Sequence, residues 1–396
     1  MARMSETGTR LASRRMITEP VAPTSPAQLA QTLDIDVTLP AGETRDLPGM
    51  PGFPVRSLDV AIDYISHVAE LGVKCVAVRI GGTPGSVKSP IYSFGPLTVS
   101  NYYGAEEDQS APTLDVILES HKAALKCIRE KFPRGSLQLV ADPYGIAPNR
   151  DGSWGIKADN GVDIDLRRSE SLLRELSTAY AEAGADAIFG LGRFGHEVAV
   201  MREALTAAGL HSQIWSLSAI TEGKTIYIYL PLDETHGDSG QLVLPGRLHE
   251  RLLQTMIDIY EGSSVIVVKP SDHLHLLTLT NLLTTSPTML DVILNAGETQ
   301  AVTAARPDLG TVLEAIRENP QAWLDSARRV RICAYTVSGQ YYTHSLLEAG
   351  RGHEFVAEIM AELFKEIRSC AGERFDVIFD RHTSWYLTHQ PGRAVA

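Results

Sequence analysis

The sequence predicts an α/β protein built as a (β/α)8 TIM barrel, with an N-terminal arm and an inserted segment on the catalytic face. Eight short runs rich in β-branched residues recur along the chain, and helical patterns with apolar residues at i, i+3, i+4 and i+7 lie between most of them. Strands that alternate with helices indicate a parallel sheet, and eight repeats indicate closure into a barrel. The length of 396 residues is compatible with one such barrel carrying insertions.

The elements follow in order along the chain. The predicted strands are residues 35–39, 73–80, 137–141, 187–191, 214–219, 265–269, 330–337 and 375–379. The predicted helices are residues 59–71, 114–132, 169–183, 196–208, 246–260 and 353–369. Several helices end on a glycine before the next strand, as at Gly72, Gly184 and Gly209, where glycine permits the left-handed helix stop.

Two parts of the chain depart from this repeat. Residues 1–30 are rich in Ser, Thr, Pro and Arg without an apolar face, so we expect an arm that becomes ordered only against another subunit, followed by one barrel domain over 31–396. Residues 276–328 are an insertion of helical character, and residues 227–245 follow the fifth strand. Both segments are either lids over the site or plain surface insertions.

Composition and charge restrict the class of protein. Hydrophobic residues make up 44% of the chain, and the net charge of −12 is spread without a basic stripe, which argues against a nucleic-acid partner. The apolar runs are far shorter than a membrane span, and no apolar signal region follows the first arginines. These features predict a cytoplasmic protein with no membrane partner. The four cysteines are widely separated and are expected to be buried thiols.

In such a barrel, chemistry is carried at the carboxyl ends of the strands. The sixth run ends on Lys269, and a buried lysine that loses hydration favours the neutral amine that forms Schiff bases; the alternative is a lysine paired with a carboxylate. The third run ends on Asp142, which is either a proton-transfer group or a helix cap. The seventh run brings Tyr335, Ser338 and Tyr341 towards the same mouth, where they could bind a substrate.

Four segments in this order resemble the porphobilinogen synthase (5-aminolevulinate dehydratase) family. They are Pro48-Gly49-Met50-Pro51-Gly52, Ala181-Glu182-Ala183-Gly184-Ala185-Asp186 with Met201-Arg202-Glu203-Ala204-Leu205, Val267-Val268-Lys269-Pro270, and Tyr335-Thr336-Val337-Ser338-Gly339-Gln340-Tyr341. The resemblance implies a barrel whose N-terminal arm embraces a neighbouring subunit, in a homo-oligomer from a dimer up to an octamer. It also implies a Schiff base on Lys269, with Ser338 and Tyr341 holding the first of two small carbonyl substrates.

The sequence departs from this family at the second substrate. The family's second lysine ends the fifth strand in a Ser-Ala-Lys run, where this chain has Ser218-Ala219-Ile220; Lys224 either replaces it or is a surface lysine. Residues 227–245 lack the arginines that the family uses to bind a carboxylate, and Arg193 either turns into the mouth or faces solvent.

The metal segment of the family also differs here. Asp142 and Asp151 stand there without Cys or His, so they are weak candidate ligands that suit at most magnesium. We therefore expect that the protein requires no cofactor and that Mg²⁺ is the one metal ion it could bind.

Three functions remain open from the sequence. The favoured one is a Schiff-base lyase that condenses or dehydrates a small keto acid or amino ketone, in secondary metabolism rather than haem synthesis. The others are a catalytically silent paralogue with a binding or assembly role, and a true 5-aminolevulinate dehydratase. Selective retention of Lys269, Ser338 and Tyr341 favours the first.

Overall fold

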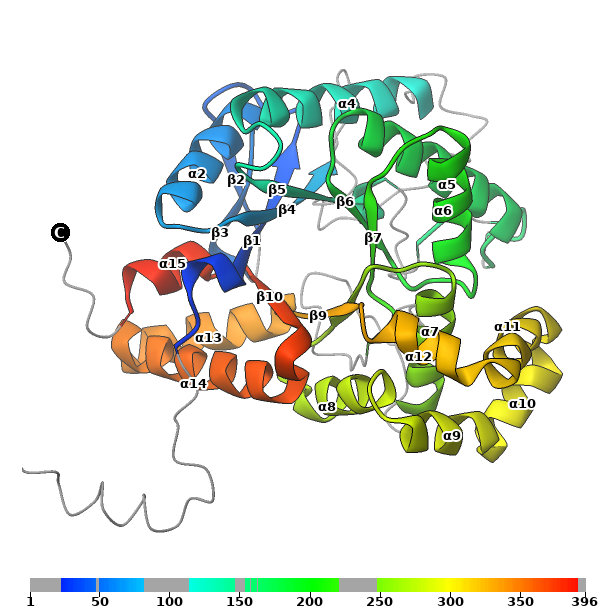
Figure 1. Cartoon of the computed structure of the whole chain (residues 1–396). Helices are drawn as coiled ribbons and strands as arrows, with labels where there is room; N and C mark the ends of the chain where they lie inside the picture. Colours follow the sequence, from blue (N-terminus) through cyan, green and yellow to red (C-terminus); the bar gives the residue numbers. More distant parts are fainter. Residues whose placement is uncertain are drawn as a thin grey trace, which may run out of the picture.

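The computed structural model describes residues 23–47, 50–81, 114–146, 154–156, 158–161, 163–220 and 248–390. Eight parallel strands form a closed barrel in the order β1, β4, β5, β6, β7, β8, β9, β10, and β10 pairs with β1 to complete the ring. Helices surround this ring (Figure 1). The structure therefore confirms the predicted (β/α)8 barrel.

All eight predicted barrel strands are present in the structure. Their bounds are β1 Leu29–Asp36, β4 Cys75–Gly81, β5 Gln138–Asp142, β6 Ala187–Gly190, β7 Gln213–Ser216, β8 Val265–Val268, β9 Arg331–Tyr335 and β10 Phe375–Asp380. The first strand was predicted six residues too late, at 35–39. Polar side chains such as Gln31 and Asp34 are buried in β1, so the strand shows no long apolar run that the sequence pattern could reveal.

The first strand also corrects the expected arm boundary. Because β1 begins at Leu29, residues 29 and 30 belong to the barrel, and a short 3-10 turn, η1 (Pro26–Gln28), precedes them. Residues 1–22, which make up most of the expected arm, lie outside the described residues. Residues 227–245 also lie outside them.

A hairpin that the sequence pattern did not predict follows β1. Strands β2 (Thr44–Leu47) and β3 (Met50–Arg56) pair antiparallel, and Arg56 pairs with Ile35 of β1. Met50, Phe53 and Val55 form a small apolar cluster with Tyr341 of helix α13 (Ser338–Arg351). The hairpin thus lies against the helix that carries two of the predicted site residues.

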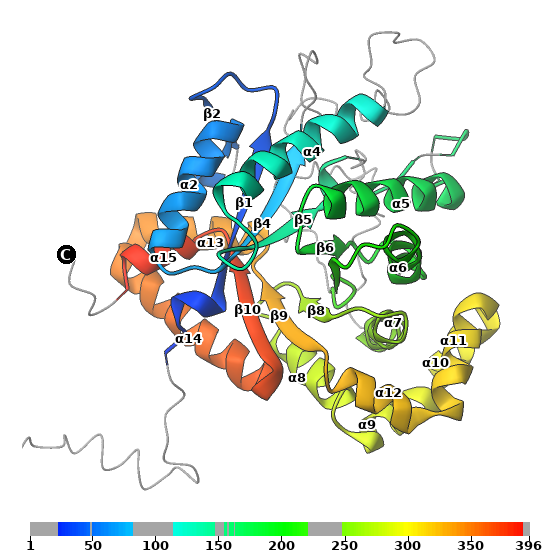
Figure 2. The same ribbon diagram turned by 45° about the horizontal axis from the view of Figure 1, so that its top comes forward.

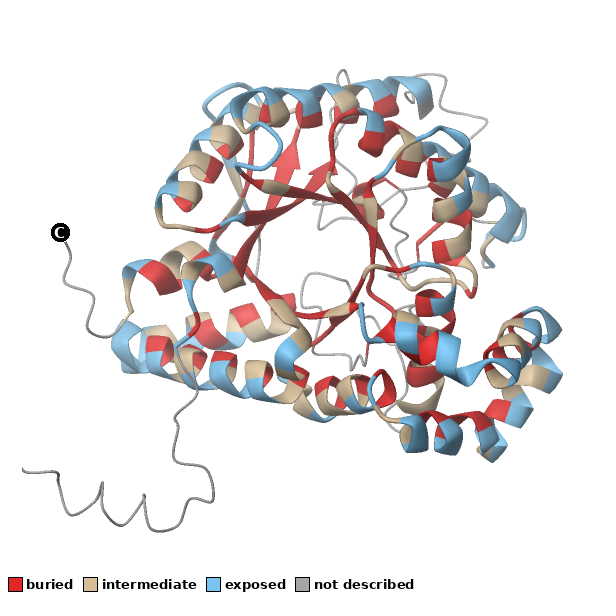
Figure 3. Cartoon of the chain, viewed as in Figure 1, coloured by how far each residue is buried: buried red, intermediate tan, exposed pale blue. Residues whose placement is uncertain are grey.

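The helices that cover the barrel bury one face each (Figure 3). The six predicted helices correspond to α2 (Leu58–Glu70), α4 (Leu114–Lys131), α5 (Leu166–Glu182), α6 (Glu197–Ala207), α7 (Leu248–Tyr260) and α14 (His353–Ala371). Two further helices, α13 and α15 (Thr383–Thr388), were not predicted. They begin soon after β9 and β10 and therefore lie at the carboxyl ends of these strands.

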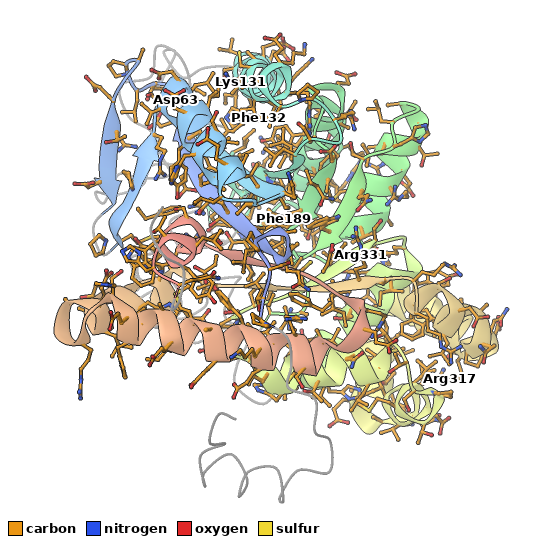
Figure 4. All side chains as sticks on the ribbon, turned by 60° about the vertical axis from the view of Figure 1, so that its left-hand side comes forward. Asp63, Lys131, Phe132, Phe189, Arg317 and Arg331 are labelled. Atoms are coloured by element: carbon orange, nitrogen blue, oxygen red, sulfur yellow. The ribbon has the colours of Figure 1, made fainter. Side chains whose placement is uncertain are left out.

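The insertion between β8 and β9 is helical. After α8 (Leu274–Leu283) it forms α9 (Pro287–Asn295), α10 (Gly297–Ala305), α11 (Pro307–Glu318) and α12 (Pro320–Ala327). These four helices contact α7 and lie outside the ring of barrel helices rather than across the mouth (Figures 1 and 2). Arg317, labelled in Figure 4, joins α11 to α9 through a hydrogen bond of 2.9 Å from Nη2 to the carbonyl of Leu294.

Aromatic side chains fill the interior of the barrel. Phe379 lies 5.3 Å from Phe189, 5.8 Å from Trp215 and 5.7 Å from Tyr335, measured between ring centroids. Phe189 of β6 is labelled in Figure 4, among the side chains of the barrel. These rings form a packed floor inside the barrel.

The cysteines only partly match the expectation. Cys75 and Cys333 are buried, and burial raises the pKa of both thiols, whereas Cys127 is exposed on α4 and Cys370 is half-buried on α14. The expectation of buried thiols is therefore correct for Cys75 and Cys333 and wrong for Cys127. Among the residues described, no helix combines the length and the apolar character that a membrane span requires.

Candidate active site

Lys269 directly follows β8, at the carboxyl end of a fully buried apolar strand. The residue is 7% exposed, and its backbone N–H donates to the carbonyl of Ala219 over 3.0 Å, which holds it against the end of β7. Its Nζ lies 6.0 Å from the centroid of the Tyr335 ring, at the end of β9. The structure thus places the predicted lysine in the barrel mouth beside one of the predicted substrate-binding side chains.

The neighbouring strand end carries an isoleucine instead of a second amine. Ile220 forms a parallel β-bridge with Lys269, so the two residues lie side by side at the ends of β7 and β8. Ile220 is 2% exposed and belongs to the main apolar core. Ile220 therefore places an apolar side chain where the resembling family has its second lysine. Lys224 lies outside the described residues.

Asp142, the last residue of β5, caps the turn that follows its strand. Its Oδ1 accepts a hydrogen bond of 2.9 Å from the backbone N–H of Tyr144, which caps the 3-10 turn η2 (Pro143–Gly145). Burial raises the pKa of its carboxyl group, while Arg79 and, more weakly, Lys269 act in the opposite direction. The structure thus shows the capping role, and the proton-transfer role of Asp142 stays a prediction.

Asp34 and Arg79 form a buried ion pair next to Asp142 that the sequence analysis missed. The Arg79 guanidinium donates from Nε and Nη2 to the two Asp34 carboxylate oxygens over 2.9 and 2.7 Å. Both residues lie within runs that otherwise look like ordinary strands. The only available signal was that a charged residue inside an apolar run must have a partner.

Ser338 and Tyr341 lie at the start of α13, directly after β9. Ser338 is fully buried at the first position of the helix. The Tyr341 hydroxyl donates to the carbonyl of Pro51 over 2.6 Å, and its ring stacks on His382 with 3.9 Å between centroids. Tyr341 is thus anchored to the hairpin.

A second group of buried polar residues surrounds the end of β10. Asp380 accepts from the Thr336 hydroxyl over 2.6 Å and from the backbone N–H of His382 over 2.7 Å. Burial raises the pKa of Asp380 and lowers that of His382 to about 3. Arg381 lies 5.6 Å from the centroid of the Tyr335 ring, so Lys269 and Arg381 both stand close to this ring. The sequence analysis did not single out Asp380, Arg381 or His382.

The loop between β6 and α6 carries Arg193. Its guanidinium lies 5.8 Å from the centroid of the Tyr144 ring, and the residue is half-buried, so it turns towards the neighbouring strand end rather than fully into solvent. Glu197 of α6 accepts hydrogen bonds from the backbone N–H groups of Leu191 and Arg193 over 2.5 and 2.8 Å, which shapes this loop. Burial raises the pKa of Glu197 to about 7.

The inserted helices reach the same loop. His196 lies 2.6 Å from Glu261 through Nδ1 and 3.3 Å from Asp308 of α11 through Nε2. Because Asp308 belongs to the insertion, this bridge connects the inserted helices to the strand-end loop after β6. The insertion thus contacts the rim of the catalytic face from outside the barrel.

The described residues do not form a metal centre. No group of three or more His, Cys, Asp or Glu side chains with ligand geometry occurs among them. Asp151, the second weak candidate ligand, lies outside the described residues. Asp142 instead has a guanidinium as its neighbour on the adjacent strand.

Comparisons with known proteins agree with this geometry. No family model matches the chain. The chain is 29% identical to the chloroplastic delta-aminolevulinic acid dehydratase of Selaginella martensii over 39% of its length and 38% of that protein. It is 23% identical to the enzyme of Bos taurus over 57% of the chain and 62% of that protein, and 21% identical to that of Methanothermobacter thermautotrophicus over 62% of the chain and 69% of that protein. The chain thus matches between about one third and two thirds of the length of these curated relatives.

A solved structure extends the likeness of the fold to most of the chain. It is delta-aminolevulinic acid dehydratase (porphobilinogen synthase) of Toxoplasma gondii ME49 in complex with the reaction product porphobilinogen. The TM-score is 0.64 at 17% identity, over 96% of this chain and 88% of that one. The chain is thus similar in sequence to delta-aminolevulinic acid dehydratases over part of its length and shares the barrel fold of one of them over most of it.

Proposed function

We propose that the protein is a Schiff-base lyase that acts through Lys269 on a small keto acid or amino ketone, by condensation or dehydration. The single observation that carries the proposal is the position of Lys269: an almost fully buried amine at the carboxyl end of a barrel strand, electrostatically coupled to Asp142. The names of the relatives, which are all dehydratases of aminolevulinic acid, support the same class of chemistry.

The chemistry follows from these two side chains. The neutral amine of Lys269 attacks the substrate carbonyl carbon, and the resulting carbinolamine loses its hydroxyl group as water to give the protonated imine. That loss requires a proton donor, and the electron pair of the nitrogen forms the new C=N bond. The raised pKa of Asp142 suits a group that gives up a proton at this step and takes one from the substrate at the next.

We propose one Schiff base rather than two. Ile220 lies beside Lys269 in the β-bridge and closes that side of the mouth with apolar surface. Among the described residues, Arg193 supplies a cation on the altered side, near Tyr144. A single carbonyl substrate on Lys269 fits this arrangement, with Ser338, Tyr335 and Tyr341 as the proposed contacts for the rest of the substrate and Lys224 as a further candidate.

The setting of the reaction is part of the proposal. We propose a cytoplasmic homo-oligomer of two to eight chains that needs no cofactor and serves secondary metabolism rather than haem synthesis. Replacement of the second lysine by Ile220 supports the change of pathway. The test also distinguishes two alternative functions. One is a true 5-aminolevulinate dehydratase, as the names of the relatives suggest, and the other is a silent paralogue that binds without turnover.

The test is borohydride trapping on the purified full chain. Levulinate, pyruvate and 5-aminolevulinate are incubated separately with the protein and borohydride, intact mass reports the adduct, and peptide mapping locates it. We expect one adduct per chain on Lys269, lost in Lys269→Gln and retained in Lys365→Gln, which changes a lysine of α14 away from the strand ends. An adduct on Lys224 would restore a two-lysine mechanism.

The same incubations separate the alternatives. Formation of porphobilinogen from 5-aminolevulinate at a steady rate would establish the true dehydratase. Absence of an adduct with all three carbonyl compounds, from a folded protein, would refute the Schiff-base proposal and leave the silent paralogue.

A further inference from the structure

Three charged side chains form a row across neighbouring strands of the barrel. Asp34 of β1 is in register with Arg79 of β4, and Arg79 is in register with Asp142 of β5. In parallel strands, residues in register lie at the same level and on the same face of the sheet. The guanidinium therefore stands between two carboxylates at the catalytic end of the barrel.

Arg79 is held firmly in this place. Its fork binds both oxygens of Asp34 over 2.9 and 2.7 Å, and the two residues are only 7% and 3% exposed. On the other side, a Cβ on Gly145 would lie 3.4 Å from Cγ of Arg79 and 2.0 Å from the carbonyl oxygen of Ile80. The turn after Asp142 thus packs directly against the strand and the stem of Arg79, and only glycine fits there.

The charges of the row require a cation at its centre. Two carboxylates in a low-dielectric environment repel each other, and a buried charge is tolerated only when it is paired. Arg79 supplies a permanent positive charge, because a guanidinium does not lose its proton in proteins. It is also the largest favourable charge acting on Asp142, ahead of Lys269.

The donor set does not fit the metal ion that resemblance to the family implies. Both Asp34 oxygens bind the guanidinium, Oδ1 of Asp142 accepts from Tyr144, and no metal-binding cluster of three occurs in the described part of the chain. Arg79 binds both oxygens of Asp34 and stands in register with Asp142, on the strand between the two carboxylates; Asp151 lies outside the described residues.

We propose that Arg79, clamped by Asp34, is a built-in cation of this site and takes the place of a divalent metal ion beside Asp142. It is a positioning residue: it balances the charge of Asp142, the carboxyl group on which Lys269 also acts electrostatically. The part of the proposal that concerns Lys269 rests on the proposed Schiff-base function. The exclusion of the metal ion does not.

The test removes the cation and asks whether a metal ion replaces it. Asp34 and Asp142 are two strands apart, about 10 Å between backbones, a gap that two aspartate side chains and one hard cation can span. Mn²⁺ serves as the probe, and loss of its free electron-paramagnetic signal reports binding. We expect no tight Mn²⁺ site in the wild type. In Arg79→Ala we expect one Mn²⁺ site per chain, with a dissociation constant roughly tenfold or more below that of the wild type.

Matched variants separate this site from other carboxylates. Asp142→Asn in the Arg79→Ala background should abolish the new site. Arg45→Ala is the control. Arg45 of β2 pairs over 2.8 Å with Asp36, a buried aspartate of β1 like Asp34, but the residue of β4 in register with Asp36 is Gly81. This variant should gain no Mn²⁺ site.

Each outcome decides the proposal. A Mn²⁺ site in the wild type that Asp142→Asn removes would overturn it, and so would a folded Arg79→Ala protein that binds no Mn²⁺. If Arg79→Ala does not fold, Arg79→Lys should fold and Arg79→Gln should not. If both variants fold or neither folds, the positive charge of Arg79 is not required and the proposal is refuted. Exhaustive chelation should leave the levulinate adduct of the wild type unchanged. Failure of the wild type to form any adduct would refute the Schiff-base function while the Mn²⁺ titrations still decide the role of Arg79.

Discussion

The buried carboxyl group of Glu197 should make the stability of the protein depend on pH. Burial raises its pKa from the ordinary value of 4.5 to about 7 in the folded state. Since a tenfold change in proton affinity corresponds to about 1.4 kcal/mol, this rise corresponds to roughly 3 kcal/mol. Below pH 4.5 the group is protonated in both states, so ionisation has no cost there. As the pH rises from 4.5 to 7, the unfolded chain releases the proton and the folded chain retains it, and stability is lost over this window.

The perturbation is Glu197→Gln, which keeps the size of the side chain and removes the titration. We expect the free energy of unfolding of the wild type to fall by about 3 kcal/mol more than that of the variant between pH 4.5 and pH 7.5. Urea denaturation at a series of pH values, with the difference between the two proteins plotted against pH, measures this quantity. Glu261, whose pKa burial also raises to about 7, is present in both proteins and cancels in the difference.

Equal pH slopes in the two proteins would refute this reasoning. They would show that Glu197 is solvated or that its pKa is ordinary. A matched comparison uses Glu203→Gln, an exposed residue of the same helix, for which we expect no change in slope.

Three further substitutions test other parts of the structure. Phe379→Ala removes the central ring of the barrel floor and should lower the free energy of unfolding by about 3–5 kcal/mol in urea denaturation, whereas a loss below about 1 kcal/mol would contradict the packed interior. Gly145→Ala should lower the melting temperature clearly, because its Cβ would lie 2.0 Å from the carbonyl oxygen of Ile80; a wild-type melting curve would contradict that close approach. Tyr341→Phe removes the hydrogen bond to Pro51 and should cost about 1 kcal/mol of stability by the same denaturation assay, and an unchanged stability would show that this hydroxyl does not anchor the hairpin.

Local pattern in the sequence was sufficient for most of the barrel. The strands around β8 are continuous apolar runs because both faces of a parallel barrel strand are buried, and such runs are visible without any knowledge of neighbours. For the same reason Lys269 stood out, as a charge at the end of an apolar strand. The predicted first strand came too late because buried Gln31 and Asp34 conceal the start of β1.

The sequence by itself determined the barrel and placed Lys269, the candidate nucleophile, and Ile220 at the ends of neighbouring strands. Only the tertiary structure decided which charges surround them: Asp34 and Arg79 are 45 residues apart in the chain, and Asp380 and Thr336 are 44 apart. These partners meet because parallel strands place their carboxyl ends at one rim, and the register of each pair fixes which side chains lie at the same level. Register depends on the packing of the whole barrel, and for that reason no local pattern in the sequence contains it.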